Sequence, residues 1–351
     1  MAEKALVVSY GDLGFNADDL LQKLHELDKE LMQLSQFVGL VYGSGFEAQP
    51  DLLQKVAELI PVIGNSTATL MAVKSASVFF ATMQKLNIKH PETYEKLPAD
   101  ADLSLYVYKF SGGSGGVHIK PAKSIQSHLL ENHYFQSKIE GLSVSLLFIA
   151  NGDEVELVGF NEQWLSANEH VSFRYGGAVS HADLSVDVQQ QLLSAAKQLT
   201  VAFGLVGLNS LDAIVQKTNV GVEQVYVLEI NPRLSATVDL YGVDDKALLY
   251  RHTQACLNQQ LDSMGRQPQH ELGVKSKAHA IVYADIDVVL MAGMVWPSWV
   301  TDSPIQINTP LKIMAGAPVC SVFAYADNAD AAKKEVLTRV RQIKKLLQST
   351  N

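Results

Sequence analysis

The sequence predicts an α/β protein whose later part is mixed α+β, built from two or three closely packed subdomains. A chain of 351 residues is longer than one small hydrophobic core requires. Residues 1–65 alternate strand-like apolar runs with helical periodicity, which is typical of an open parallel sheet. Further along, two β-prone runs at 211–216 and 225–231 flank a short polar turn, which indicates a hairpin.

Composition and charge exclude several classes of protein. Hydrophobic residues make up 47% and charged residues 19%, as in an ordinary globular protein. The net charge of −9 argues against binding nucleic acid through a basic face. The two cysteines, Cys256 and Cys320, provide neither a disulfide framework nor a CxxC metal site. Because no signal-peptide pattern and no run near the roughly 20 apolar residues of a membrane span is found, we expect a cytoplasmic protein without membrane contact.

The first 65 residues are predicted to form strands and helices in turn. The strands are three short apolar runs: residues 5–9, 39–42 and 60–64. Leucines between Leu20 and Leu34 recur with a helical period, and a second helix is expected at 50–59. Gly43-Ser-Gly45 follows the second strand at its carboxyl end, where open parallel sheets bind ligands. This stretch is therefore either a tight turn or a loop that faces a substrate.

A helix is predicted from Asn65 or Ser66, one of which serves as N-cap, to about Leu86. It carries Lys74, and the segment after it continues to Pro91-Glu-Thr93. A lone lysine on a helix is usually an ordinary solvated side chain. The alternative, a phosphate-binding lysine, depends on its spacing to the residues that follow.

A strand that ends at Lys109 leads into a loop with four glycines in five positions. The loop consists of Ser111, Gly112, Gly113, Ser114, Gly115 and Gly116. Glycines let backbone N–H groups approach phosphate oxygens without a clash at Cβ. No Gly-Lys-Ser/Thr follows, so this is not a Walker loop. It is either a phosphate-binding loop or a flexible hairpin loop.

The predicted hairpin carries polar residues where a buried strand should be apolar. Glu229, Asn231 and Arg233 alternate along one strand, so their side chains point the same way. If the hairpin is centred between Val220 and Gly221, Asp212 lies opposite Glu229. In the same register Ile214 lies opposite Val227. Facing carboxylates repel unless a hard cation such as Mg²⁺ binds between them. The alternative is a strand end held by a Glu229–Arg233 salt bridge.

These motifs, in this order, resemble the ATP-grasp superfamily from about Gly64 to about Leu240. The resemblance rests on Lys74 with the later Pro91 and Thr93, on Lys109 with its glycine loop, and on Asp212 before Glu229-Ile-Asn231-Pro-Arg233. The family usually has proline after the strand lysine, where this chain has Phe110. The resemblance implies an ATP-grasp fold after an N-terminal open parallel-sheet domain. Its expected divisions are 1–65, a small nucleotide-clasping subdomain at 66–142, and a large subdomain with a C-terminal extension at 143–351.

The resemblance also implies a role for each site residue. Asp212, Glu229 and Asn231 are expected to hold Mg²⁺, with Mn²⁺ as an alternative, and Lys74, Lys109 and the glycine loop to hold the phosphates of ATP. Arg233, Asn231 and Lys74 are the expected catalytic residues. Gln136, Ser137 and Ile139 fall on the adenine side. Ser143 stands where the family often has an acidic residue for the ribose.

The implied activity is an ATP-dependent carboxylate–amine ligase that forms an acyl phosphate and releases ADP. Four stretches further resemble ATP-grasp proteins of methanopterin- and methanofuran-linked one-carbon metabolism, near the tyramine– and tyrosine–glutamate ligases. They are Gly43-Ser-Gly-Phe46, Glu229 to Arg233, Asp302-Ser-Pro304 and Gly316-Ala-Pro-Val-Cys320. We therefore expect small-molecule carboxylate and amine substrates, no nucleic-acid partner, and a homodimer as one option for assembly. Two other classes stay open: a bicarbonate-activating carboxylase or carbamoyl-phosphate-type enzyme, and a non-catalytic ATP sensor.

Overall fold

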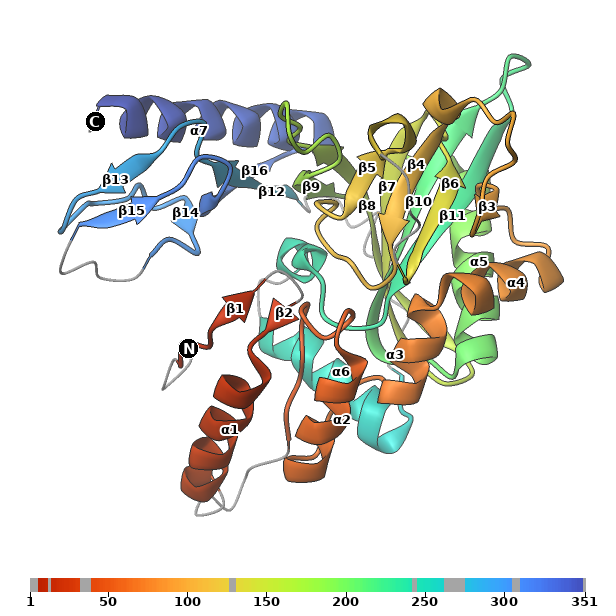
Figure 1. The fold of residues 1–351 in the computed structure, drawn as a ribbon, viewed down its shortest axis with the longest axis horizontal. Coiled ribbons are helices and arrows are strands. Elements are labelled where there is room, and N and C mark those ends of the chain that lie inside the picture. Colours follow the sequence, from red (N-terminus) through yellow and green to blue (C-terminus); the bar gives the residue numbers. More distant parts are fainter. Residues whose placement is uncertain are drawn as a thin grey trace.

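The structure is a computed structural model in which an N-terminal helical unit, a small sheet and a large sheet pack together (Figure 1). It describes residues 6–11, 14–31, 39–125, 131–241, 245–261, 275–304 and 310–349. Within those ranges, no helix is long and apolar enough to cross a bilayer.

The N-terminal unit is mostly helical, with α1 (Ala17–Leu31) beside α2 (Pro50–Leu59). Leucines along α1 meet Leu52, Leu53 and Val56 of α2 in a small core. Among the described residues of this unit, the expected parallel sheet is reduced to one parallel bridge, Leu40 with Val62. Residues 6–9 form no strand, and the short β1 (Tyr10–Gly11) pairs with β2 (Gly14–Phe15) instead. Residue 5 of the first expected strand lies outside the described residues.

The helix predicted from residue 66 to about 86 is two helices, α3 (Thr67–Lys74) and α4 (Ala76–Lys85). Ser66 caps α3, as one of the two predicted N-caps, because its hydroxyl accepts the Thr69 N–H at 3.1 Å. The break falls at Ser75, whose backbone is extended and which ends one helix and begins the next. Serine favours such positions because its side chain competes for backbone hydrogen bonds. The break leaves Lys74 at the very end of α3.

A small antiparallel sheet follows, in the order β3-β6-β4-β5. Its strands are β3 (Thr93–Tyr94), β4 (Tyr106–Phe110), β5 (Ile119–Pro121) and β6 (His133–Ser137). Short 3-10 turns lie at Leu103–Leu105 and Ala122–Ser124. Val107 pairs with Gln136 and Lys109 with Tyr134, so these four side chains share one face.

The large sheet is antiparallel throughout, in the order β11-β10-β7-β8-β9-β12-β16-β14. Its strands are β7 (Leu142–Asn151), β8 (Val155–Leu165), β9 (Tyr175–Ser180), β10 (Val206–Lys217), β11 (Glu223–Asn231), β12 (Ser276–Tyr283), β14 (Val300–Thr301) and β16 (Pro318–Ala326). A separate pair joins β13 (Val288–Leu290) to β15 (Leu311–Ile313).

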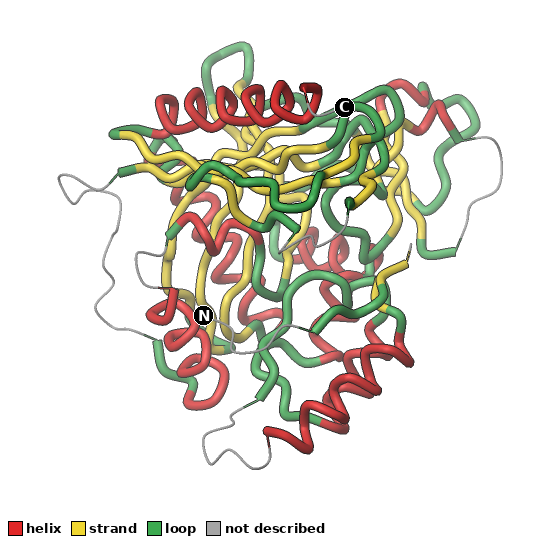
Figure 2. Tube along the Cα trace, turned by 90° about the vertical axis from the view of Figure 1, so that its left-hand side faces the viewer, coloured by secondary structure: helices red, strands yellow, loops and turns green. Residues whose placement is uncertain are grey.

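Helices cover both faces of this sheet. Strand β7 is buried on both sides: Leu146 and Phe148 pack with residues of α5 (Val186–Phe203), while Leu147 and Ile149 pack with residues of α6 (Asp245–Asn258). The alternation follows from the two-residue repeat of a strand. A 3-10 turn, Ala236–Leu240, follows β11. The C-terminal α7 (Ala329–Ser349) lies along β12 and β16 (Figure 2).

The predicted hairpin register is confirmed at the residues that matter for the site. Asp212 of β10 pairs with Glu229 of β11. The prediction that Ile214 faces Val227 is wrong, because Val227 pairs with Ala213. A β-bulge between Asp212 and Ala213 leaves Leu228 as an extra residue on β11. Between the bulge and the turn, each residue of β10 therefore pairs with the β11 residue one position earlier in the chain than the predicted register gives.

His252 of α6 joins the N-terminal unit to the large sheet. It is 1% exposed, its Nδ1 accepts the Leu208 N–H at 2.8 Å, and its Nε2 donates to the Ile63 carbonyl at 3.0 Å. This pattern requires the neutral ring with its proton on Nε2. Burial lowers the pKa of His252, although the hydrogen bond to Ile63 opposes the shift.

We expect His252→Gln to make the stability of the protein less dependent on pH. As pH falls below about 6.5, the unfolded chain takes up a proton at this residue that the folded chain does not, so folding weakens. The substitution should reduce stability at pH 8 and flatten the loss between pH 7 and 5 by up to about 1.4 kcal/mol per pH unit. Denaturant unfolding at several pH values measures both. His25→Gln, at an exposed histidine of α1, is the control, and equal slopes for the two variants would contradict the prediction.

Candidate active site

The polar residues of the β10–β11 hairpin converge on one cavity. Asn231 Nδ2 donates to Asp212 Oδ2 at 2.9 Å, and Arg233 Nη2 donates to Asn231 Oδ1 at 3.3 Å. Asp212, Glu229, Asn231 and Arg233 all line a cavity of about 360 Å³. The shared facing predicted from the two-residue repeat thus brings two carboxylates, an amide and a guanidinium together.

The two carboxylates of this cavity have pKa values that move apart. Confinement away from bulk water and the neighbouring Glu229 charge raise the pKa of Asp212, while Lys74 and a hydrogen bond from Gln163 oppose the rise. The same confinement acts on Glu229, but the charges of Lys74 and other nearby cationic groups hold its pKa below the usual range. Two carboxylates that are paired across neighbouring strands, as Asp212 and Glu229 are, favour a bound cation, because a positive charge offsets their mutual repulsion.

Lys74 reaches this pair from the end of α3. Its ammonium donates to Glu229 Oε2 at 3.2 Å and to Asn231 Oδ1 at 3.0 Å, and its side chain is 8% exposed. The salt bridge between Glu229 and Arg233, the alternative left open by the sequence, is replaced by one between Glu229 and Lys74. The break at Ser75 matters here, because it places Lys74 where a helix ends and a side chain can point toward β11.

Lys109 enters the cavity from the opposite side, on β4 of the small sheet. It is 8% exposed, and burial lowers its pKa, while the charges of Glu229 and Asp212 oppose that shift. Lys109 lines the 360 Å³ cavity together with Ser114, Gly115 and Gly116 of the glycine loop. Two cations, Lys74 on α3 and Lys109 on β4, therefore approach Glu229 from different elements.

Two glycines of the loop lie against backbone of other elements, so no larger residue fits there. A Cβ at Gly116 would lie 1.8 Å from the Phe173 carbonyl oxygen, and one at Gly112 would lie 2.3 Å from that of Glu47. Both have positive φ, +74° and +80°. Gly115 also has positive φ, but a Cβ there would meet nothing within 4 Å. The Gly115 carbonyl accepts the Tyr175 N–H at 2.9 Å, which ties the loop to the large sheet.

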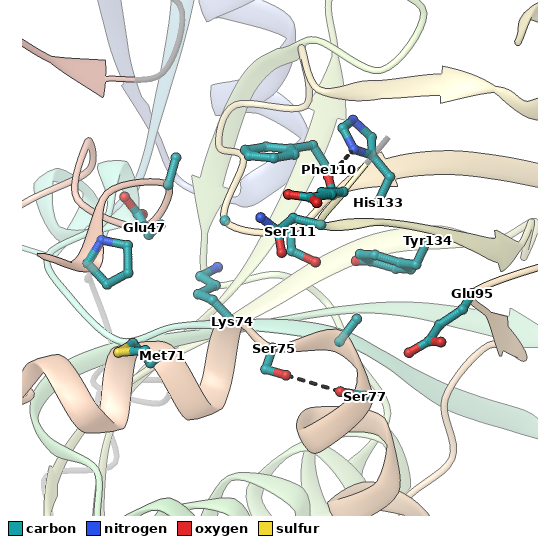
Figure 3. Close-up of a pocket in the computed structure, with 16 residues that line it drawn as sticks. Glu47, Met71, Lys74, Ser75, Ser77, Glu95, Phe110, Ser111, His133 and Tyr134 are labelled. Atoms are coloured by element: carbon teal, nitrogen blue, oxygen red, sulfur yellow. Dashed lines mark hydrogen bonds between the residues drawn. The ribbon is translucent and has the colours of Figure 1, made fainter. Parts of the chain in front are cut away.

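A second pocket of about 530 Å³ lies beside this cavity, between the N-terminal unit and the small sheet (Figure 3). Lys74, Ser111 and Gly112 line it, together with Glu47 and Tyr134. Lys74 points from α3 into this pocket in Figure 3 while its ammonium bonds Glu229 and Asn231 of the first cavity. The predicted phosphate residues are thus divided between two neighbouring cavities, except for Gly113, which lines neither and packs on the ring of His118.

The four residues predicted for the adenine and ribose side lie near the junction of the two sheets. Gln136 on β6 is 1% exposed, and its Nε2 has no partner among the described residues. Ser137 ends β6, and Ile139 lies in the connection to β7. These three line neither of the two cavities. Ser143 on β7 lines the 360 Å³ cavity, and its hydroxyl donates to Gln163 Oε1 at 3.5 Å.

Three further residues of the site were missed in the sequence. Gln163 of β8 donates to Asp212 Oδ1 at 3.2 Å, His118 lines the cavity beside the glycine loop, and Glu47 bonds Arg233. Burial lowers the pKa of His118 to about 4, so its ring is neutral. An acid directly after Gly43-Ser-Gly-Phe46, and a histidine two residues after the glycine loop, were the available signals. Gln163 had none, because its role depends on strand pairing.

The donor set suits a magnesium ion and a nucleotide. Among the described residues, no group of three or more His, Cys, Asp or Glu side chains is placed to hold a metal. Asp212, Glu229 and Asn231 offer two carboxylates and an amide, and Mg²⁺ is usually held by one or two carboxylates with the remaining ligands from phosphates and water. Two of the buried polar atoms without hydrogen-bond partners among the described residues are His118 Nδ1, on a residue that lines the 360 Å³ cavity, and Gln136 Nε2, on β6 of the small sheet.

Residues 77–237 match the family model of the ATP-grasp domain. Curated relatives include the large chain of carbamoyl phosphate synthase from Xanthomonas campestris pv. campestris, which is 23% identical over 233 residues. That alignment covers 60% of this chain and 21% of the relative, so the chain spans about a fifth of the length of this relative.

Two solved structures cover most of the chain. The L-amino acid ligase from Bacillus licheniformis has a TM-score of 0.66 at 12% identity, covering 93% of this chain and 84% of its own. The biotin carboxylase domain dimer of 2-oxoglutarate carboxylase from Hydrogenobacter thermophilus, solved with MgADP, ADP and bicarbonate, has a TM-score of 0.65 at 11% identity, covering 90% and 76%. At these identities the likeness establishes a shared fold. Residues 77–237 are therefore identified as an ATP-grasp domain.

Proposed function

We propose that this chain is a Mg²⁺- and ATP-dependent ligase that joins a carboxylate to an amine and releases ADP. One observation carries the proposal: Asp212 and Glu229 face Lys109 and the glycine loop across a single cavity. Activating a carboxylate with ATP needs a metal and several phosphate-binding groups in one place, because phosphoryl transfer depends on positioning and charge neutralisation. The ATP-grasp domain at residues 77–237 and the fold shared with an L-amino acid ligase support it.

On the metal side, Asp212, Glu229 and Asn231 are the proposed ligands. A bound magnesium ion supplies charge neutralisation for the transferring phosphoryl group. The residues around the ligands keep their oxygen atoms in place: Gln163 donates to Asp212, and Arg233 donates to Asn231. Such supporting hydrogen bonds orient the ligands of a metal.

On the nucleotide side, Lys74, Lys109 and the backbone N–H groups of residues 111–116 are the proposed phosphate contacts. Gln136, Ser137 and Ile139 are proposed for the adenine side and Ser143 for the ribose. Arg233, which lines the cavity with Ser235 and Thr237, is placed to stabilise charge on the transferring group and on the acyl phosphate. The loop and the small sheet would shield that intermediate from water, since acyl phosphates hydrolyse readily.

The substrate is proposed to be an amino acid or a one-carbon cofactor precursor, as for a tyramine– or tyrosine–glutamate ligase. The support is the Gly43-Ser-Gly-Phe46 loop, whose Ser44 lines the 360 Å³ cavity together with Arg233, and the fold shared with the L-amino acid ligase. The subdomain divisions at residues 65 and 142, and a homodimer, belong to the same proposal. The neighbouring biotin carboxylase domain is itself described as a dimer.

A bicarbonate-activating enzyme is the second candidate. Its specific support is the sequence similarity to carbamoyl phosphate synthase large chains and the fold shared with a biotin carboxylase domain. The two candidates differ in what stimulates ATP consumption. A carboxylase or carbamoyl-phosphate-type enzyme hydrolyses ATP with bicarbonate and no amine, whereas a carboxylate–amine ligase needs both an organic carboxylate and an amine.

We expect ADP and phosphate as the nucleotide products when amino acids and one-carbon cofactor precursors are supplied in pairs. The reason is that the carboxylate pair and the glycine loop face each other, as an acyl-phosphate-forming site requires. Chromatography of the spent nucleotide distinguishes ADP from AMP. AMP as the main product would refute the mechanism, and turnover that depends on bicarbonate alone would favour the second candidate.

Gly116→Ala should weaken MgATP binding much more than Gly115→Ala. Both positions have positive φ, which costs a residue with a Cβ about 1–2 kcal/mol. Only at position 116 would that Cβ also overlap a backbone oxygen, that of Phe173, so the loop must move. Calorimetric titration with MgATP measures the effect, and thermal unfolding checks that both variants fold. Equal affinities in the two variants would show that this loop does not hold the nucleotide.

Lys109→Ala should weaken ATP binding by about ten- to a hundredfold, the loss expected for a charge-assisted hydrogen bond of about 1.5–3 kcal/mol. Glu229→Gln should chiefly lower turnover, because it disturbs the metal rather than the phosphates. Titration calorimetry and single-turnover kinetics separate the two effects. Lys120→Ala, at an exposed lysine on neighbouring β5, is the matched control and should change neither. If Lys109→Ala behaves like the control, the phosphate site lies elsewhere.

A further inference from the structure

A carboxylate from the N-terminal unit, Glu47, is buried against the guanidinium of Arg233. Arg233 Nε donates to Glu47 Oε1 at 2.7 Å, and the two side chains are 9% and 2% exposed. The other carboxylate oxygen accepts the Gly45 N–H at 2.8 Å. Both oxygens of Glu47 are therefore bonded, and its orientation is fixed by the glycine-containing turn that precedes it.

The contacts of Arg233 fix the orientation of its guanidinium group and use only some of its N–H donors. Nη1 donates to the Leu234 carbonyl at 3.1 Å and Nη2 donates to Asn231 Oδ1 at 3.3 Å. With the bond to Glu47, these contacts take three of the five N–H groups of an arginine. Because Arg233 also lines the 360 Å³ cavity, the others can serve a ligand there.

A buried ion pair is a costly way to hold two parts of a protein together. Removing both charges from water is unfavourable, and apolar residues of similar volume often stabilise a contact as well or better. The location of this pair suggests a different role. Asn231, which Arg233 contacts, bonds both Asp212 and Lys74. Without Glu47, the Arg233 guanidinium would be drawn to the carboxylates of the metal site.

We propose that Glu47 is a positioning residue: it holds Arg233 toward the reacting end of the cavity and keeps it from pairing with Asp212 and Glu229. The inference deepens the proposed function and rests on it. It gives the N-terminal unit a direct part in the reaction, since Glu47 lies on the segment between Leu40 and α2. The metal carboxylates then stay available to a divalent cation.

Two further contacts hold the segment that contains Glu47. The Tyr42 hydroxyl donates to the Pro232 carbonyl at 3.1 Å, next to Arg233 in the chain. The Glu47 carbonyl lies where a Cβ at Gly112 would stand, so the glycine loop rests on it. Figure 3 shows Glu47 across the pocket from Ser111 of that loop. Glu47 thus lies where the N-terminal unit meets the glycine loop and the residues that follow β11, Pro232 and Arg233.

Glu47 is not suited to act as the base that deprotonates an amine. Burial by itself would raise the pKa of its carboxyl group, but the charges of Arg233 and Lys74 and two hydrogen bonds hold that pKa below the usual range. A carboxylate held this firmly in its ionised form, with both oxygens bonded, is a weak proton acceptor.

The first test needs no substrate. Mn²⁺ is titrated into the full chain with a non-hydrolysable ATP analogue and followed by electron paramagnetic resonance, for wild type, Glu47→Gln, Glu47→Asp and Glu47→Gln with Arg233→Ala. Glu47→Gln should weaken Mn²⁺ binding at least fivefold, and Glu47→Asp should recover part of the loss. Removal of Arg233 in the double variant should also recover part of the affinity, although Asn231 then loses its bond from Arg233. Unchanged affinity in Glu47→Gln, or a double variant as weak as Glu47→Gln, overturns the proposal.

The second test uses an active substrate pair. Glu47→Gln should lower kcat at least tenfold with KM for ATP within about threefold, and the double variant with Arg233→Ala should be no slower than Arg233→Ala alone. Glu58→Gln, at an exposed acid of α2, is the control and should match wild type. If the kcat losses of the two single variants multiply in the double variant, Glu47 acts independently of Arg233. Failure of the wild type to bind Mn²⁺ with the analogue would instead refute the proposed nucleotide site, so the two failures are distinct.

Discussion

Two carboxylates facing one another across a strand pair constrain the rest of the site. Asp212 and Glu229 are paired residues of β10 and β11, and both open into the same cavity. Their repulsion has to be offset by positive charge or by hydrogen-bond donors. The structure supplies both: Lys74 from α3, Lys109 from β4, Gln163 from β8 and the amide of Asn231. Each donor comes from a different element, so the fold is organised to bring them there.

The apolar packing explains why such a cluster can be held in place. Strand β7 separates the hairpin from β8 and is buried on both faces, by α5 on one side and α6 on the other. Close packing of this kind resists displacement, because a cavity or an overpacked side chain costs several kcal/mol. Asp212 lies on the strand that pairs directly with β7. The polar residues thus lie on strands that this packing holds in place. The glycine loop approaches them from the small sheet, and its Gly115 carbonyl accepts the Tyr175 N–H of the large sheet.

Sequence reasoning succeeded where a local rule determines the outcome and failed where tertiary contacts do. The two-residue repeat placed Asp212 opposite Glu229, and the serine at 66 capped α3 as expected. The bulge at Leu228 left no signal in the residues, so the pairing of Ile214 was misplaced. The break at Ser75 was missed because apolar periodicity continues through it. In the described part of the N-terminal unit, the expected parallel strands are reduced to a bridge between Leu40 and Val62, since apolar runs cannot show how many residues of two strands pair.

Lys74 shows how one side chain can serve two occupants of the same site. In this structure its ammonium bonds Glu229 and Asn231, two of the proposed metal ligands, so it already supplies positive charge next to them. A magnesium ion at those oxygens would compete with the ammonium for the same lone pairs. A triphosphate would offer Lys74 new partners of opposite charge, which are favourable for a lysine even when it leaves a carboxylate. Metal and nucleotide are therefore expected to favour each other at this site, since the phosphates take over the lysine that the metal displaces. The buried Glu47–Arg233 pair belongs to the same arrangement. In its proposed role, Glu47 keeps the Arg233 guanidinium from competing with Lys74 and the metal for the oxygen atoms of the ligands.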